Sequence, residues 1–164
     1  VTLPKTTEVQ DTTGDHQYVL GVSELTADRT VTLPLLTGND EFVFKDHTQT
    51  LTKKRINPRL VTATSYTTDT GTSLDVSTCD QFEITAQAGA LKFNNPSGTP
   101  LGGQKLVIRI KDSGAARALT YDTQFRGMGV DLPDTTVKGK TLYMGFIFNA
   151  TDTKWDLVAV AQEE

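Results

Sequence analysis

TLYMGFIF, at residues 141–148, is the most strongly strand-forming segment of this 164-residue sequence. In an extended strand, successive side chains point to opposite faces. One face of this segment would carry Leu142, Met144, Phe146 and Phe148. Tyr143 and Ile147 make the other face apolar as well. A strand that is apolar on both sides is typical of the centre of a sheet, or of a strand that a neighbouring subunit covers.

Further strand-like segments surround this one. QFEITAQ (residues 81–87) and KLVIRIK (residues 105–111) alternate apolar and polar side chains with a period of two. NATDTK (residues 149–154) is a turn sequence, so WDLVAV (residues 155–160) would form a hairpin with residues 141–148. Shorter strands are expected in SLDVS, ALKF and RALTY, at residues 73–77, 90–93 and 117–121. Seven or eight such strands predict an antiparallel β-sandwich or jelly roll over residues 61–164, and the whole chain reads as all-β.

Residues 1–60 have a different pattern. Their apolar pieces, VTLPLL at residues 31–36 and FVF at residues 42–44, are each too short to build a core alone. The turn sequence TGND separates them, and Asn57-Pro58 closes the region. We therefore expect an extended N-terminal arm with short strands, which packs against identical chains. The candidate packing residues are Val31, Leu33, Leu35, Phe42, Phe44 and Leu51.

Composition and charge narrow the function classes. Threonine, at 28 residues, favours strands because its branched β-carbon fits a pleated surface. The net charge of −4 gives no reason to expect a nucleic-acid partner, which would require a concentrated basic face. One basic cluster stands out, and no aromatic residues are interleaved with it: Lys53, Lys54, Arg55 and Arg59. It is interpreted as a solvated rim or as a contact to an acidic neighbour in an assembly.

The sequence contains no convincing catalytic or cofactor motif. Cys79 is the sole cysteine, and the two histidines, His16 and His47, lie in the other part of the chain. The Gly-rich stretch at residues 94–106 lacks the Gly-Lys-Ser/Thr of a phosphate loop and is expected to be a long hairpin. We therefore expect neither an enzyme nor a cofactor. A threefold metal site built from three copies of one histidine stays open as an alternative.

Two observations concern contacts and location. QFRGMG, at residues 124–129, places Phe125, Arg126 and Met128 in a Gly-flexed loop, and such side chains are enriched at interfaces. This loop is a candidate exposed contact, and the alternative is a loop folded over the edge of the sandwich. No window has the 18 or more apolar residues of a membrane span, and no apolar run of signal-peptide length occurs near residue 1. Neither a membrane nor export is expected.

Two stretches carry a family resemblance. HTQTLTKKRI, at residues 47–56, resembles the HTQTLTNKT element that recurs in tail-fibre and other fibre-like proteins of tailed phages, although its end is more basic. The whole of residues 11–56 looks like a segment of those proteins. Residues 82–127 and 139–164 are similar to a C-terminal β domain that also recurs in phage structural proteins. Together these stretches cover most of the chain.

The resemblance implies a non-enzymatic homotrimer on the virion surface, made in the host cytoplasm. Its N-terminal part, residues 1–60, would anchor and intertwine, and residues 61–164 would be displayed. One implied function is that of a capsid decoration or head-fibre protein, whose basic cluster contacts acidic loops of the major capsid protein. The alternative is a receptor-binding tail-fibre tip that recognises host-surface glycans through loops of the C-terminal domain. The short chain favours the first function.

Overall fold

The computed structural model of the chain describes residues 6–10, 13–14, 17–21, 26–27, 54–66, 71–72 and 74–164, together with residues 30, 36, 43, 48, 50 and 52. Within this part the protein is all-β: it contains strands and turns and no helix, and hence no helix that could cross a membrane. The chain divides into two compact units, Val1–Thr52 and Lys53–Glu164. The sequence places its boundary eight residues later in the chain, after residue 60.

The described residues of the N-terminal unit form one antiparallel hairpin. Strand β1 (Thr6–Gln10) pairs with β2 (Gln17–Gly21), from Thr6 opposite Gly21 to Gln10 opposite Gln17. In the connection, Gly14 has a φ of 76°, a conformation that glycine adopts without the steric cost of a β-carbon. Val9 and Val19 are 51% and 53% exposed. An isolated two-stranded hairpin is marginally stable in water.

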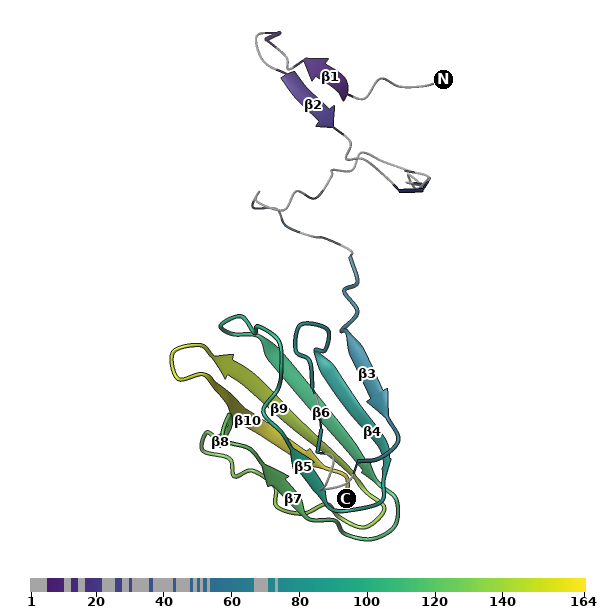
Figure 1. The fold of residues 1–164 in the computed structure, drawn as a ribbon, viewed down its shortest axis with the longest axis vertical. Coiled ribbons are helices and arrows are strands. Elements are labelled where there is room, and N and C mark those ends of the chain that lie inside the picture. Colours follow the sequence, from purple (N-terminus) through teal and green to yellow (C-terminus); the bar gives the residue numbers. More distant parts are fainter. Residues whose placement is uncertain are drawn as a thin grey trace. The chain divides into compact units, whose positions relative to one another are not determined.

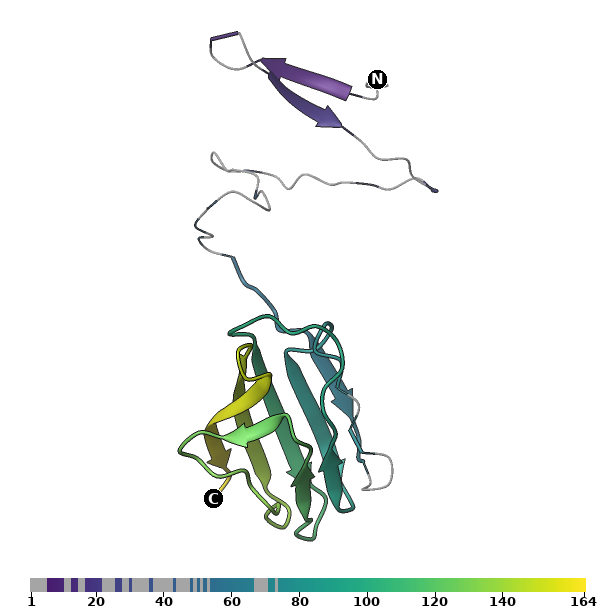
Figure 2. The same cartoon turned by 60° about the vertical axis from the view of Figure 1, so that its left-hand side comes forward.

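The C-terminal unit contains eight strands, shown in Figure 1. They are β3 (Leu60–Ala63), β4 (Gln81–Gln87), β5 (Leu91–Phe93), β6 (Lys105–Asp112), β7 (Leu119–Tyr121), β8 (Phe125–Gly127), β9 (Thr141–Asn149) and β10 (Lys154–Gln162). A six-stranded sheet has the order β3-β4-β6-β9-β10-β8, and a small sheet pairs β5 with β7. The small sheet lies over one face of the large one (Figure 2). The apolar β9 is an interior strand, as the sequence predicts.

The prediction of a purely antiparallel domain is wrong, because the large sheet is mixed. The pairs β3–β4, β4–β6 and β8–β10 are parallel, and so is β5–β7 in the small sheet. Only β6–β9 and β9–β10 are antiparallel in the large sheet. The chain leaves β4 for β5 in the small sheet and returns as β6, so β6 enters beside β4 in the same direction. Residues 94–104 therefore connect two layers and do not form the predicted hairpin.

One hydrophobic core fills the space between the two sheets. The predicted alternation is confirmed for β6, for β9 and for Phe82 and Ile84 of β4, whose inward residues are at most 3% exposed, apart from Phe148 at 6%. At the end of β4 the register shifts, so that Gln87 is buried and Ala86, the predicted inward residue, is not. Leu91 and Phe93 of β5 and Leu119 of β7 close the core from the small sheet. The Phe93 ring stacks on the Tyr121 ring with centroids 5.2 Å apart. Trp155 is fully buried, as expected of a core residue.

The hairpin of β9 and β10 is confirmed, and its turn has a specific cause. The Asn149 side-chain oxygen accepts hydrogen bonds from the backbone N–H groups of Thr151 and Asp152, at 3.0 and 3.1 Å. Such local bonds are the reason that asparagine favours turns. Further along β10 the register shifts between Leu157 and Ala159, so Val158 is a bulge residue and is 47% exposed.

Asp112, at the end of β6, is a buried carboxylate that holds two loops together, the β6–β7 connection and the β8–β9 connection. Its side chain accepts hydrogen bonds from the backbone N–H groups of Gly114 and Gly139, at 2.7 and 2.9 Å, and from the Thr136 hydroxyl at 2.9 Å. Burial by itself raises the pKa of this carboxyl, but the hydrogen bonds together outweigh burial and leave the pKa below its usual value. The negative charge of Asp112 is therefore stabilised by hydrogen-bond donors and not by a nearby cation.

Candidate functional site

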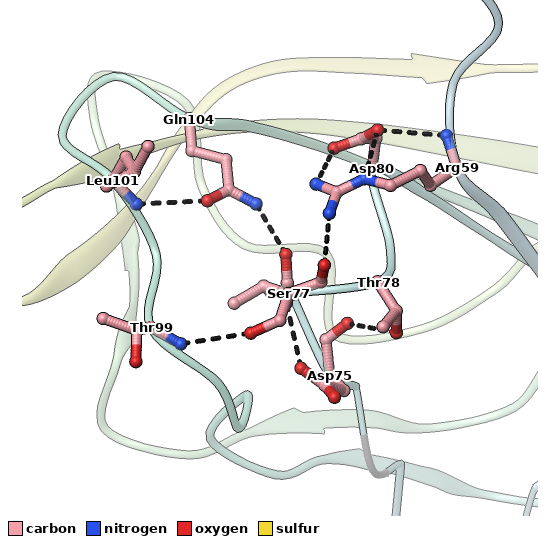
Figure 3. A network of polar contacts seen from close by, with 9 residues as sticks. Arg59, Asp75, Ser77, Thr78, Asp80, Thr99, Leu101 and Gln104 are labelled. Carbon is pink, nitrogen blue, oxygen red and sulfur yellow. Dashed lines mark hydrogen bonds and ion pairs between the residues drawn. The ribbon is translucent and has the colours of Figure 1, made fainter. Parts of the chain in front are cut away.

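Arg59 holds the chain in place immediately before strand β3 begins. Its Nε donates to Oδ2 of Asp80 at 2.9 Å, and its Nη2 donates to Oδ1 at 2.6 Å. The backbone N–H of Arg59 also donates to Oδ2, at 3.0 Å, and Nη1 donates to the carbonyl of Ser77 (Figure 3). The hydrogen bonds from Arg59 lower the pKa of Asp80 to about 2. We call this arrangement the Arg59 clasp.

The clasp belongs to a wider polar network at the same end of the domain (Figure 3). Gln104 Nε2 donates to the carbonyl of Val76 at 2.8 Å, and Gln104 Oε1 accepts from the N–H of Leu101 at 3.1 Å. The Ser77 hydroxyl accepts a longer hydrogen bond, of 3.4 Å, from the N–H of Thr99. The connection between the two layers is thus tied to the turn that holds Arg59.

The predicted basic cluster is divided by this geometry. All three described members, Lys54, Arg55 and Arg59, are exposed, and Arg59 forms an ion pair with Asp80. Lys53 lies outside the described residues. The same holds for the six predicted packing residues, which are Val31, Leu33, Leu35, Phe42, Phe44 and Leu51, and for His16 and His47. The predicted arm packing and the histidine alternative therefore stay predictions.

The predicted exposed loop around Phe125 is partly wrong. Residues 125–127 form strand β8, which pairs in parallel with β10. Phe125 is 6% exposed, and its ring packs edge-on against those of Phe93 and Phe146. Met128 is half exposed, as predicted. The strand alternation sends Phe125 into the core because the chain returns here from the small sheet to the edge of the large one.

Arg126 points away from the core and is held by acidic residues of the last hairpin. Its Nε donates to Asp156 Oδ1 at 2.8 Å, and its Nη2 donates to Asp156 Oδ2 at 3.1 Å and to Asp152 Oδ2 at 3.0 Å. These bonds from Arg126 keep the pKa of Asp156 below its usual value. One guanidinium thus donates hydrogen bonds to the carboxylates of both Asp152 and Asp156, which fits a structural role.

The face of the large sheet that is turned away from the small sheet carries a shallow hollow. Its volume is about 330 Å³, and its lining comprises Arg109, Thr141, Tyr143, Ala161, Gln162 and Glu163. Arg109, Tyr143 and Ala161 lie side by side on β6, β9 and β10. Of these residues, only Tyr143 stands out in the sequence, as part of the apolar outer face of residues 141–148. The alternation puts Arg109 and Tyr143 on outward faces, but nothing in the sequence gives the register that brings them together.

Within the described residues the structure offers no metal centre, because no group of three His, Cys, Asp or Glu side chains could hold an ion there. Cys79 is buried, and desolvation raises the pKa of its thiol, which disfavours the nucleophilic thiolate. The Asp131 and Asp134 side chains are both exposed in the connection between β8 and β9. This part of the chain therefore gives no support to a catalytic mechanism.

Comparisons of the chain with protein-family models, with curated proteins and with solved structures give no match.

Proposed function

We propose that this chain is a non-enzymatic structural protein of a phage virion, a trimeric capsid decoration or head-fibre protein. In this proposal the N-terminal arm attaches to the major capsid protein, and the two-layered, sandwich-type domain of residues 61–164 is displayed on the particle surface. The proposal combines the sequence resemblance with the way in which the chain is divided. The alternative of a receptor-binding tail-fibre tip predicts the same division and differs in location.

The observation that carries the proposal is the contrast between the two units. The C-terminal unit has a complete core, in which the largest side chains are fully buried. The described part of the N-terminal unit is a two-stranded hairpin that leaves Val9 and Val19 half exposed. Because Glu8 lies opposite Val19 and Tyr18 lies opposite Val9, the two valines are on opposite faces of the hairpin. Burying both faces requires partners, and identical chains would supply them.

The first residues of the C-terminal unit support an anchoring role. Residues 54–59 are exposed and contain Lys54 and Arg55, whereas the Arg59 clasp fixes the end of this segment on the domain. In the proposal, the exposed cations contact acidic loops of the capsid. The clasp would then set the direction in which the displayed domain leaves its attachment point.

The oligomeric state of the purified full chain tests the proposal first. Light scattering coupled to size-exclusion chromatography is expected to give three times the 17.9 kDa chain mass. Removal of residues 1–52 is expected to give a monomer that keeps the thermal unfolding of the C-terminal unit. A monomeric full chain would contradict the trimer, and a trimeric truncated chain would contradict the role of the arm.

Attachment is tested with particles that lack the protein, to which purified protein is added back. The double substitution Lys54→Glu and Arg55→Glu is expected to weaken rebinding at least tenfold, and electron microscopy should place the wild-type protein on the head. The matched control reverses two exposed cations of the C-terminal unit, Lys105→Glu and Lys138→Glu. Equal loss in both variants would mean that total charge, and not the arm, controls binding. A location at the tail tip would favour the alternative.

A further inference from the structure

The hollow on the outward face of the large sheet exists because a large and a small side chain are neighbours. Tyr143 on β9 lies opposite Ala161 on β10, and Tyr143 is 42% exposed. The methyl group of Ala161 is too small to cover the side of the tyrosine that faces β10. One side of the hollow is therefore the exposed ring of Tyr143, and its base is the small side chain of Ala161. Its volume, about 330 Å³, is at the lower end of the range of roughly 300–1,000 Å³ for small-ligand sites.

Arg109 closes the other side of Tyr143 and is held in a defined orientation. Its Nε donates to the Tyr143 hydroxyl at 3.1 Å, and its guanidinium carbon lies 5.9 Å from the centroid of the tyrosine ring. The structure describes no hydrogen bond from the Arg109 Nη groups and, among the described residues, no carboxylate within ion-pair distance of them. An oriented guanidinium with unused donors is suited to a carboxylate, which it can bind through two parallel hydrogen bonds.

Two carboxylates of this face, those of Glu163 and Glu83, already accept hydrogen bonds within the chain. Lys111 Nζ donates to Glu163 at 3.1 Å, and the backbone N–H of Thr141 donates to the same carboxylate oxygen at 2.8 Å. On β4, Glu83 lies opposite Arg109 but accepts its side-chain hydrogen bond from Gln81, at 2.8 Å. The lining of the hollow therefore combines one available cation, an aromatic surface and a fixed carboxylate that can accept hydrogen bonds from hydroxyl groups.

We propose that this hollow binds one acidic pyranose, a sugar of the uronic-acid class at the surface of a polysaccharide. The sugar carboxylate would be bound by the Nη groups of Arg109, and the C–H face of the ring would rest against Tyr143 above Ala161. The sugar hydroxyls would donate to Glu163. This site lies on the sheet and not in the loops, and it depends neither on the trimer nor on attachment to a particle.

The test uses the full-length protein and a tetrasaccharide that contains glucuronic acid. Its neutral counterpart is the same tetrasaccharide with each carboxyl group reduced to the alcohol. For a single shallow site we expect a dissociation constant of about 0.1–1 mM for the acidic probe, and binding about tenfold weaker for the neutral one. Amide shifts in NMR spectra should change at Tyr143 and Ala161. Absence of binding at 10-fold above this range, on the order of 10 mM, would overturn the proposal.

Three variants separate the parts of the site. Arg109→Gln should abolish the preference for the acidic probe, whereas Lys105→Gln, on the same face of the same strand but outside the hollow, should leave it unchanged. Ala161→Phe should block both probes without altering the charge, and unchanged thermal unfolding will show that each variant is folded. Equal effects of Arg109→Gln and Lys105→Gln, or equal competition by inorganic sulfate, would reduce the site to unspecific anion binding and overturn the proposal.

Discussion

The ring of Phe125 packs edge-on against the ring of Phe146, with the two centroids 5.3 Å apart. This contact joins the edge strand β8 to the interior strand β9 over the intervening strand β10. A segment with two glycines and an arginine would be expected on the surface, yet here its phenylalanine closes one end of the hydrophobic core.

Phe125→Ala should therefore lower the free energy of unfolding by about 3–5 kcal/mol, because it leaves a cavity among the rings of the core. Met128→Ala, three residues later at a half-exposed position, should change it by less than about 0.5 kcal/mol. Urea unfolding of the two variants measures the difference. Similar values for both would mean that β8 is not packed as described.

Asp112→Ala should lower the free energy of unfolding by about 3 kcal/mol, because it leaves the N–H groups of Gly114 and Gly139 and the Thr136 hydroxyl without their acceptor. Asp112→Asn keeps one acceptor oxygen and should cost less. Asp131→Ala, at an exposed carboxylate, is the control and should be almost neutral. A neutral Asp112→Ala variant would show that water replaces the carboxylate in these loops.

The Arg59 clasp should control the local opening of strand β3. Arg59→Gln and Asp80→Asn are each expected to speed hydrogen exchange at the backbone N–H groups of residues 60–63, with little effect on β9. Because the two side chains form one contact, the double variant should exchange no faster than the more affected single variant. Additive effects in this cycle would mean that the two residues act independently.

Acid should destabilise the C-terminal unit over a defined range. The Arg59 hydrogen bonds lower the pKa of Asp80 from 3.8 to about 2, and the Lys111 hydrogen bond lowers that of Glu163 from 4.5 to about 2. A lowered pKa in the folded state adds stability above the unfolded-state value, and this stability is lost as the carboxylate is protonated. The melting temperature should therefore fall between about pH 4.5 and pH 2.

The Asp80→Asn variant measures the part of this acid destabilisation that Asp80 causes. Its melting temperature should lie below that of the wild type at pH 7, and the gap should narrow towards pH 2, where Asp80 of the wild type takes up a proton. Differential scanning calorimetry at a series of pH values measures the gap. A gap that stays constant with pH would assign the effect of the substitution to packing and not to charge.

The sequence predicts the inward and outward residues of the long strands well, because alternation is a local property. Phe82, Ile108 and Met144 are buried as their positions in the pattern require. Strand direction is not local, and the alternation of residues 81–87 reads the same in a parallel and an antiparallel pair. The sequence also predicts strands in ALKF and RALTY. It does not predict that these strands pair in a second layer, and this arrangement makes β4 and β6 parallel.

For the candidate sites too, the sequence predicts local properties and misses contacts between distant residues. Arg59 was singled out as part of a basic cluster, but its partner Asp80 lies 21 residues away, and only the fold brings them together. Phe125 was misplaced because the glycines around it suggested a loop, whereas its pairing with Trp155 defines a strand. The apolar pattern of residues 141–148 includes Tyr143, but nothing in the sequence pairs it with Arg109, because their contact arises from register.

The position of β10 also has a consequence for biosynthesis. Strand β10 is the latest strand of the domain in sequence order, yet it lies between β9 and β8, inside the large sheet. During translation β8 cannot join the sheet until residues 154–162 have left the ribosome and inserted beside it. Until then, the backbone N–H and C=O groups along one edge of β9 have no partner strand. This unpaired edge can form contacts with other unfinished chains. The emergence of residues 154–162, and not that of the earlier strands, therefore sets the moment at which the large sheet closes.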